Sequence, residues 1–196
     1  MSKRLSGVLC AVLTLLSFNV HAVTIDFESL ANGINPGTSY TESGFTISAT
    51  SLIAVSASSA EYHGSPALRN GIQSNTPNTT LTVSGGGTFN LTSIDLAEVG
   101  SNNMYIATIN FTGHQQDGGM VHQSFTLDGI YATGNPFETL HFINFTNLTS
   151  LTWDNRSPYH QFDNIVASVV PLPAAVWLFG SGLLGMLVIT RRRRSA

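Results

Sequence analysis

Short stretches in which apolar and polar residues alternate with a period of two recur between residues 23 and 170. Because successive side chains of a β-strand point to opposite faces, this alternation predicts half-buried strands. The predicted strands are Val23–Phe27, Gly44–Ala49, Leu52–Ala57, Thr79–Val83, Ser93–Glu98, Met104–Thr112, Val121–Leu127, Leu140–Phe145, Ser150–Trp153 and Gln161–Val169. No stretch in this region has a helical period, so we expect an all-β domain over residues 23–169.

Turn residues separate the predicted strands. Gly85-Gly86-Gly87, Asp117-Gly118-Gly119 and Asp128-Gly129 lie between apolar runs, where glycine and aspartate favour tight turns. Short strands with turn signals at these intervals are typical of an antiparallel β-sandwich, and we expect one of the jelly-roll type.

The first 22 residues depart from this pattern. Lys3 and Arg4 precede an apolar run from Leu9 to Phe18, and Val20-His21-Ala22 matches a small-x-small cleavage site. This layout predicts a secretory signal peptide over residues 1–22, handled by the Sec translocon and cut by signal peptidase between Ala22 and Val23. Cys10, the single cysteine, lies in the removed segment, so no disulfide is expected in the exported domain.

The last residues form a second exception. Pro171-Leu172-Pro173 is followed by the uncharged residues 174–190 and then by four arginines, Arg191, Arg192, Arg193 and Arg194. A helix over residues 174–190 would be roughly 25 Å long, close to the ~30 Å hydrocarbon core of a bilayer. We expect a transmembrane helix whose stop-transfer arginines stay in the cytoplasm, with residues 23–170 on the other side. A plain hydrophobic anchor is the alternative.

The three-part tail resembles the PEP-CTERM sorting signal over residues 170–196. Here Pro171-Leu172-Pro173 stands for the Pro-Glu-Pro motif, as the VPLPA variant with leucine in place of the acidic residue. The resemblance implies export by a Gram-negative bacterium, usually one that makes extracellular polysaccharide. It also implies cleavage near the motif by an exosortase. The protein would then pass from the inner membrane to the cell surface or the extracellular matrix.

Charge is distributed unevenly along the chain. Without the two terminal segments, Arg69 and Arg156 face eleven carboxylates, so the domain carries a net charge near −9. Because phosphate binding depends on lysine and arginine, nucleic acid is excluded as an expected partner. Neutral sugars and divalent cations remain open.

The two ends of the domain carry similar short motifs, Ile25-Asp26-Phe27-Glu28 and Phe162-Asp163-Asn164-Ile165-Val166. They resemble exported bacterial β-sandwiches of the carbohydrate-binding type, in which the first and last strands pair. Such pairing would bring Asp26, Glu28 and Asp163 together as ligands for a structural calcium ion. The alternative is that these carboxylates are simply solvated.

Aromatic residues near predicted loops are candidate sugar platforms, because a pyranose ring stacks on an aromatic face. The stretch WDNRSPY supplies the predicted ligand-binding residues Trp153, Asp154, Asn155, Arg156 and Tyr159. Tyr62, Tyr105, Tyr131 and His160 are further candidates. Trp153 follows Leu151 at strand spacing, so a place in the core is the alternative reading.

No catalytic motif is present. The histidines lack zinc-binding spacing, and there is no GxSxG sequence. The favoured hypothesis is a non-catalytic domain that binds or organises extracellular polysaccharide. A purely structural surface or biofilm component is the second, and a polysaccharide hydrolase or lyase that uses paired carboxylates is the third.

Overall fold

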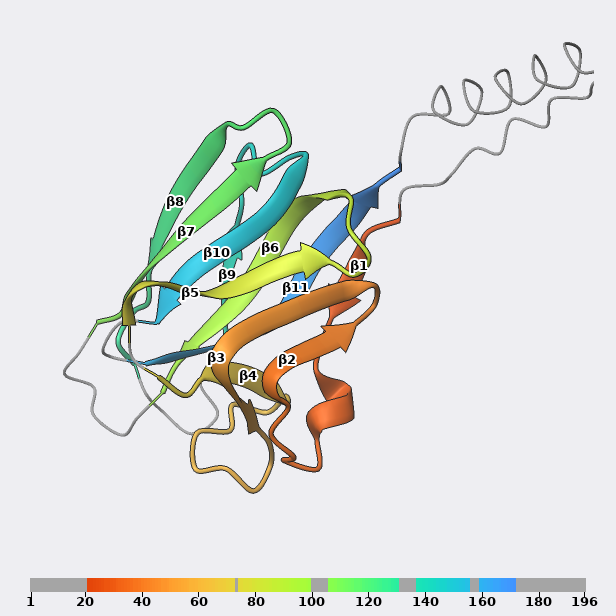
Figure 1. Ribbon diagram of the computed structural model, residues 1–196. Coiled ribbons are helices and arrows are strands. Elements are labelled where there is room, and N and C mark those ends of the chain that lie inside the picture. The colour runs from red at the N-terminus through yellow and green to blue at the C-terminus, as the bar shows by residue number, and fades with distance from the viewer. Residues whose placement is uncertain (1–20, 73, 100–105, 131–136, 156–158, 172–196) are drawn as a thin grey trace, which may run out of the picture.

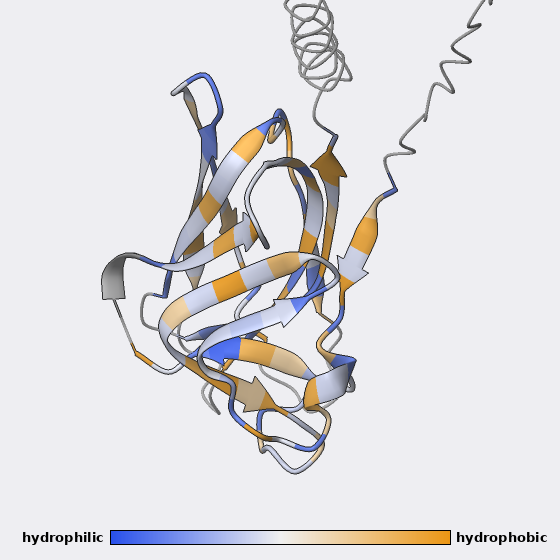
Figure 2. Cartoon of the chain, turned by 45° about the vertical axis from the view of Figure 1, so that its right-hand side comes forward, coloured by the Kyte–Doolittle hydropathy of each residue, from blue (hydrophilic) through white to orange (hydrophobic). Residues whose placement is uncertain are grey.

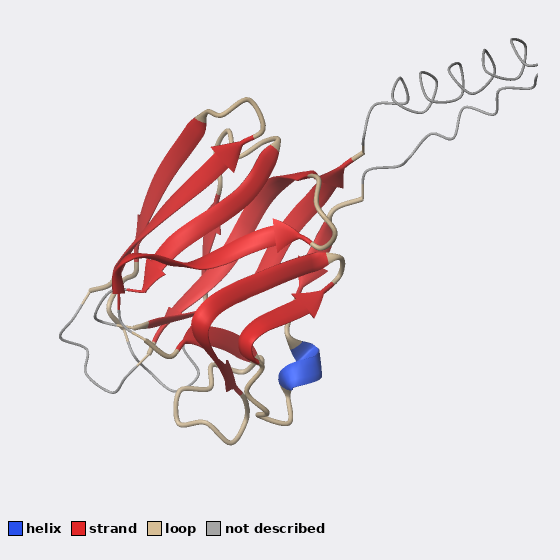
Figure 3. Ribbon diagram, viewed as in Figure 1, coloured by secondary structure: helices blue, strands red, loops and turns tan. Residues whose placement is uncertain are grey.

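The computed structural model describes residues 21–72, 74–99, 106–130, 137–155 and 159–171 (Figure 1). Its strands are β1 (Val23–Ile25), β2 (Gly37–Glu42), β3 (Phe45–Val55), β4 (Ala67–Asn70), β5 (Ser74–Val83), β6 (Thr88–Glu98), β7 (Thr108–Gln115), β8 (Met120–Thr126), β9 (Glu138–His141), β10 (Leu148–Asn155) and β11 (His160–Val170). A single 3-10 turn, η1 (Glu28–Leu30), is the helical element of these ranges (Figure 3). The predicted all-β class is therefore confirmed.

The predicted terminal segments lie almost wholly outside this part of the chain. Residues 1–20 of the signal peptide fall outside it, as do Leu172, Pro173 and the segment from residue 174 to the arginines Arg191–Arg194. Among the residues that the structure does describe, none forms a helix long and apolar enough to cross a membrane.

The strands form a sandwich- or barrel-like arrangement of two layers. Hydrogen bonds join them along the path β8-β7-β10-β5-β3-β4-β11-β6-β9, with β2 beside β3 and β1 beside β11. The long strand β3 passes between layers: Phe45–Ala49 pairs with β5, and Leu52–Val55 pairs with β4. A further contact between Leu148 of β10 and Phe89 of β6 joins the layers at the opposite end.

The first and last strands pair, as the carbohydrate-binding resemblance implies. Val23, Thr24 and Ile25 of β1 lie opposite residues 167, 166 and 165 of β11 in antiparallel register. Phe27, directly after β1, adopts a left-handed φ of 55° and is fully buried. A bulky residue in this region costs about 1–3 kcal/mol, so the packing of its ring must compensate. Both ends of the described chain leave the domain on the same side (Figure 1).

A chain of aromatic rings fills the space between the layers. It runs through Tyr40, Phe27, Phe162, Trp153, Phe111, Phe142 and Phe145, with successive ring centroids 4.7–5.9 Å apart. Trp153 lies in the middle, with no exposed surface, and meets Phe162 edge to face. Along many of the strands apolar residues alternate with polar ones (Figure 2), because one side of these strands faces the core.

Strand boundaries differ from the prediction where polar residues obscure the pattern. Gly44–Ala49 and Leu52–Ala57 were expected as two strands, but β3 is continuous through Thr50 and Ser51. Sequence patterning misses β2, whose residues are mostly exposed on both faces, and β4, which is short and buried on both faces. A period-two signal needs one buried and one exposed face, so neither strand produces it.

Replacing Trp153 with alanine is expected to destabilise the domain by about 3–5 kcal/mol, since it opens a large cavity at the centre of the aromatic chain. Such a loss is comparable to the whole stability of many domains, which is about 5–15 kcal/mol. The measurement is the free energy of unfolding in urea.

The matched variant is Trp153→Phe. Trp153 Nε1 has no hydrogen-bond partner, so phenylalanine removes only volume and should cost clearly less than alanine. Equal losses for the two variants would contradict a central packing role for this ring.

Candidate functional site

The outward face of the layer β2-β3-β5-β10-β7-β8 carries small polar side chains in register. One cross-strand row, each member paired with the next, consists of Ser39, Ser48, Thr80, Thr152, Thr112 and His122. We call these six residues the polar row, and none of them is buried. Because neighbouring strands lie about 4.8 Å apart, the row is roughly 24 Å long.

Hydrogen bonds between strands order this face. Thr112 Oγ1 lies 3.1 Å from Nδ1 of His122 within the row. Beside it, the hydroxyls of Thr108 and Thr126 are 2.9 Å apart. Such cross-strand pairs restrict the side-chain rotamers, so the donors and acceptors of the face hold fixed positions.

The carboxylate of Asp154, on this face, is occupied by hydrogen bonds within the protein. Both the backbone N–H and the side-chain amide of Asn110 donate to Asp154, each at 3.1 Å. Ser124 in turn donates to Asn110 Oδ1 at 2.7 Å. Asp154 is only 2% exposed, so the accessible face is formed by neutral hydroxyls, amides and imidazole.

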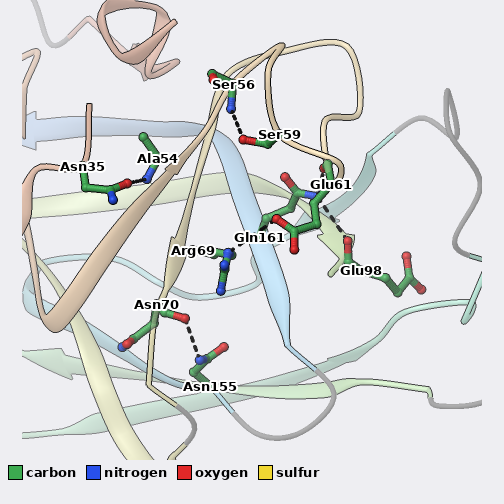
Figure 4. A network of polar contacts seen from close by, with 10 residues as sticks. All are labelled: Asn35, Ala54, Ser56, Ser59, Glu61, Arg69, Asn70, Glu98, Asn155 and Gln161. Atoms are coloured by element: carbon green, nitrogen blue, oxygen red, sulfur yellow. Dashed lines mark hydrogen bonds and ion pairs between the residues drawn. The ribbon is translucent and has the colours of Figure 1, made fainter. Parts of the chain in front are cut away.

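The residues predicted as a ligand-binding loop occupy mixed positions. Trp153 belongs to the core, which is the alternative that its spacing had left open, and Asp154 and Asn155 are also buried. The Asn155 amide donates to the Asn70 carbonyl at 3.0 Å (Figure 4). It also donates to the Ile72 carbonyl at 3.0 Å. These buried groups present no surface on which a sugar ring could stack.

Arg156 lies outside the described residues, and Tyr159 is half-buried with the Arg69 guanidinium 6.0 Å from its ring centroid. Among the other aromatic candidates, Tyr62 is half-buried and His160 is buried, while residues 105 and 131 lie outside the described ranges. A ligand role for Arg156 and Tyr159 stays a prediction.

The predicted calcium ligands are only partly brought together. Asp163 lies in the field of Asp26, and also directly opposite Asp95 of β6. Glu28 sits exposed in η1, where its backbone N–H donates to Asp26 Oδ1 at 3.2 Å. Asp95 was not anticipated from the sequence, because its place opposite Asp163 depends on the β6–β11 register.

A different carboxylate trio lies close together in the described part of the chain. Ligand atoms of Glu98, Asp128 and Glu138 all lie within 4.8 Å of one another. Gly129 N–H donates to Glu98 at 2.7 Å, and Asp128 N–H donates to Glu138 at 2.9 Å. Burial raises the pKa of Glu138, and the neighbouring carboxylates raise it further. Oxygen ligands of this kind suit calcium, and structural calcium stays a prediction for this domain.

Two buried titratable groups on β11 have opposite pKa shifts. Burial lowers the pKa of His160 to about 4, partly opposed by the charge of Asp154. Burial raises the pKa of Asp163 to about 7, and the Asp95 and Asp26 carboxylates add to this, while hydrogen bonds from Ser65 and Asn164 oppose it. At neutral pH His160 is therefore uncharged inside the domain.

Comparisons with known proteins identify no family. No protein-family model and no curated protein sequence matches the chain. A solved structure of the CBM22-1–GH10 modules of the Clostridium thermocellum endo-1,4-β-D-xylanase 10B, complexed with xylohexaose, is similar at 13% identity with a TM-score of 0.40. The alignment covers 76% of this chain but only 28% of the xylanase chain. A likeness at this level carries no argument about ligand or activity.

The opposite shifts of His160 and Asp163 predict opposing effects of pH on stability. Between pH 4 and 6.5 the unfolded chain protonates its histidine while buried His160 stays neutral, so this group makes stability rise with pH. Between pH 3.8 and 7 folded Asp163 holds a proton that the unfolded chain has lost, so it makes stability fall as pH rises.

Replacing Asp163 with asparagine should therefore make the free energy of unfolding increase more steeply with pH across this window. His160→Gln should produce the reverse change in slope. Urea titrations from pH 4 to 7, in EDTA to remove divalent cations, measure both. Unchanged slopes in both variants would show that neither group titrates differently on folding.

Proposed function

We propose that this protein is an exported, non-catalytic domain that binds or organises extracellular polysaccharide. The polar row is the observation that carries the proposal. Sugar hydroxyls are both donors and acceptors, and the row offers hydroxyl and imidazole groups of the same two kinds along roughly 24 Å of sheet. Because the face is uncharged and the domain as a whole is acidic, it suits a neutral polymer better than an anionic one.

We also propose that the layers form a jelly roll. The strands β4 to β11 supply an eight-stranded double layer in the orders β4-β11-β6-β9 and β5-β10-β7-β8. Such a double sheet is the arrangement of jelly-roll domains. Broad sheet faces of this kind give an extended ligand a surface rather than a deep cleft.

The proposed export route agrees with the limits of the folded domain. Strand β1 begins at Val23, directly after the predicted signal-peptidase site, and β11 ends at Val170, directly before Pro171. Cleavage at either predicted site would leave every described strand intact. We propose that the tail directs the protein from the inner membrane to the cell surface or matrix.

Removing hydroxyls from the polar row should weaken binding to neutral polysaccharide. The triple variant Thr80→Val, Thr112→Val and Thr152→Val keeps side-chain shape but loses three hydrogen-bonding groups, each worth about 0.5–1.5 kcal/mol. Affinity should fall at least about tenfold. Affinity electrophoresis against a panel of neutral and acidic polysaccharides, with and without calcium, measures this.

The control is the pair Thr24→Val and Thr92→Val, which are exposed threonines on β1 and β6 in the other layer. It should bind like the unmodified protein. Absence of binding to every polysaccharide, in either calcium condition, would overturn the proposed function. Release of reducing ends from native matrix would overturn its non-catalytic part.

The proposed sorting predicts a defined mature species. Intact mass measurement of the native protein from inner membrane, outer envelope and medium should find a chain that starts at Val23 and ends near Pro171 outside the inner membrane. A species that retains Arg191–Arg194, found only in the inner membrane, would contradict sorting and leave the tail as a plain anchor.

A further inference from the structure

A small polar cavity lies at one end of the sheet that carries the polar row. It has a volume of about 360 Å³ and is lined by Gln115, Gln116, Asp117 and Asn147. The first three belong to the end of β7 and the turn into β8, and Asn147 directly precedes β10. This volume is at the lower end of the range for small-ligand pockets, roughly 300–1,000 Å³.

Backbone hydrogen bonds hold the two walls of the cavity together. Gln116 N–H donates to the Asn147 carbonyl at 3.0 Å, and Gln115 N–H donates to Gly119 O across the turn at 2.8 Å. Asn147 N–H donates to Asn90 Oδ1 at 2.9 Å, which ties this wall to β6. The side-chain amide of Gln115 donates to Thr146 O at 3.3 Å. The cavity is therefore preformed, which limits the entropy lost on binding.

Two acceptor oxygens converge over Gly119. A Cβ placed on Gly119 would lie 2.9 Å from Gln115 Oε1 and 3.0 Å from Asp117 Oδ1. The Gln115 amide nitrogen donates to the Thr146 carbonyl, so the amide oxygen is the atom that faces the space over Gly119. Asp117 Oδ1 already accepts from Gly119 N–H at 2.9 Å, which fixes the direction of the carboxylate and leaves Oδ2 as a second acceptor.

We propose that this cavity is a subsite for one ring of a neutral sugar, recognised through two adjacent hydroxyls. A carboxylate and an amide oxygen side by side accept the O–H groups of a vicinal diol, while the amides of Gln116 and Asn147 supply donors for the hydroxyl oxygens. Hydrogen bonds to a charged acceptor are about twice as strong as neutral ones, so Asp117 is the main contributor.

The same charge defines which sugars are rejected. A uronate or sulfated ring would place an anion beside Asp117 in a domain whose net charge is near −9, with no lysine between residues 23 and 170. The subsite thus selects neutral over acidic sugars. This inference rests on the proposed polysaccharide binding and names the unit that is recognised.

The cavity is connected to the rest of the sheet through His114. This residue directly precedes Gln115 on β7 and pairs with Ser150 and Met120. Thr149 donates its hydroxyl to the His114 carbonyl at 3.1 Å. A polymer along the outward face would therefore reach the cavity at the end of β7.

The experiment measures the affinity of the full-length protein in detergent for neutral hexasaccharides (glucan, mannan and galactan) and for an oligogalacturonate of equal length. Asp117→Asn should weaken the best neutral ligand at least about tenfold. It should also reduce the preference for neutral over acidic ligand, which a loss of folding would not do. Gly119→Ala, which displaces the flexible Gln115 amide at little cost to stability, should weaken binding several-fold.

Glu61→Gln is the matched control, since it removes one half-buried carboxylate in the loop between β3 and β4, and it should bind like the unmodified protein. If Asp117→Asn and Gly119→Ala both bind normally while the polar-row variant is weakened, the subsite is wrong and the proposed function stands. If they lose affinity while the polar-row variant does not, the subsite is supported and the polar row is not the binding surface. If the unmodified protein binds none of the probes, both fall.

A single neutral hexose, tested as its methyl glycoside, shows whether the subsite binds an isolated ring or only a ring within a chain. Competition with the hexasaccharide at millimolar concentration would show that one ring suffices. Failure of the glycoside to compete, while binding of the hexasaccharide still depends on Asp117, is the opposite outcome. In that case the subsite binds a ring only as part of a chain, and recognition of a single ring is overturned.

Discussion

The packing of aromatic rings between the two layers is the interaction on which this fold depends. Residues 23–170 contain no cysteine, so burial of apolar surface has to hold the layers together without a disulfide. The rings from Tyr40 to Phe145 connect β2, β7, β10 and β11 and both loops that carry Phe27 and Phe142. Since Phe111 and Trp153 turn the inner side of β7 and β10 toward these rings, the outward side of the same strands carries Thr112 and Thr152 of the polar row.

Much of the fold could be predicted because alternation records which face of a strand is buried. In β7 buried residues alternate with accessible ones, in β8 half-buried residues alternate with exposed ones, and the sequence locates both strands. The pattern fails for β2, which is exposed on both faces, and for β3, where Thr50 and Ser51 interrupt the apolar residues without ending the strand. Hydrogen bonding to neighbours continues a strand through such positions, and pairing is a property of the whole sheet.

The candidate site was less accessible to prediction, because register brings its residues together. Ser39 and His122 are the two ends of the polar row, and placing them there requires the register of five strand pairings. Asp95 likewise meets Asp163 through pairing. Trp153 was a candidate sugar-binding residue in the sequence, but it lies at the centre of the core. It is two residues after Leu151 on the same strand, so both side chains point to the inner face.

The pairing of β1 with β11 has a consequence for the order in which the domain folds. These strands lie roughly 140 residues apart in the sequence, so the contact closes a loop that spans nearly the whole domain, and such contacts form late. While the chain emerges N-terminus first, β4 and β6 lack their common neighbour β11. Folding can therefore be completed only after the last strand is present, so the layer β4-β11-β6-β9 stays open until the end of the domain has been made.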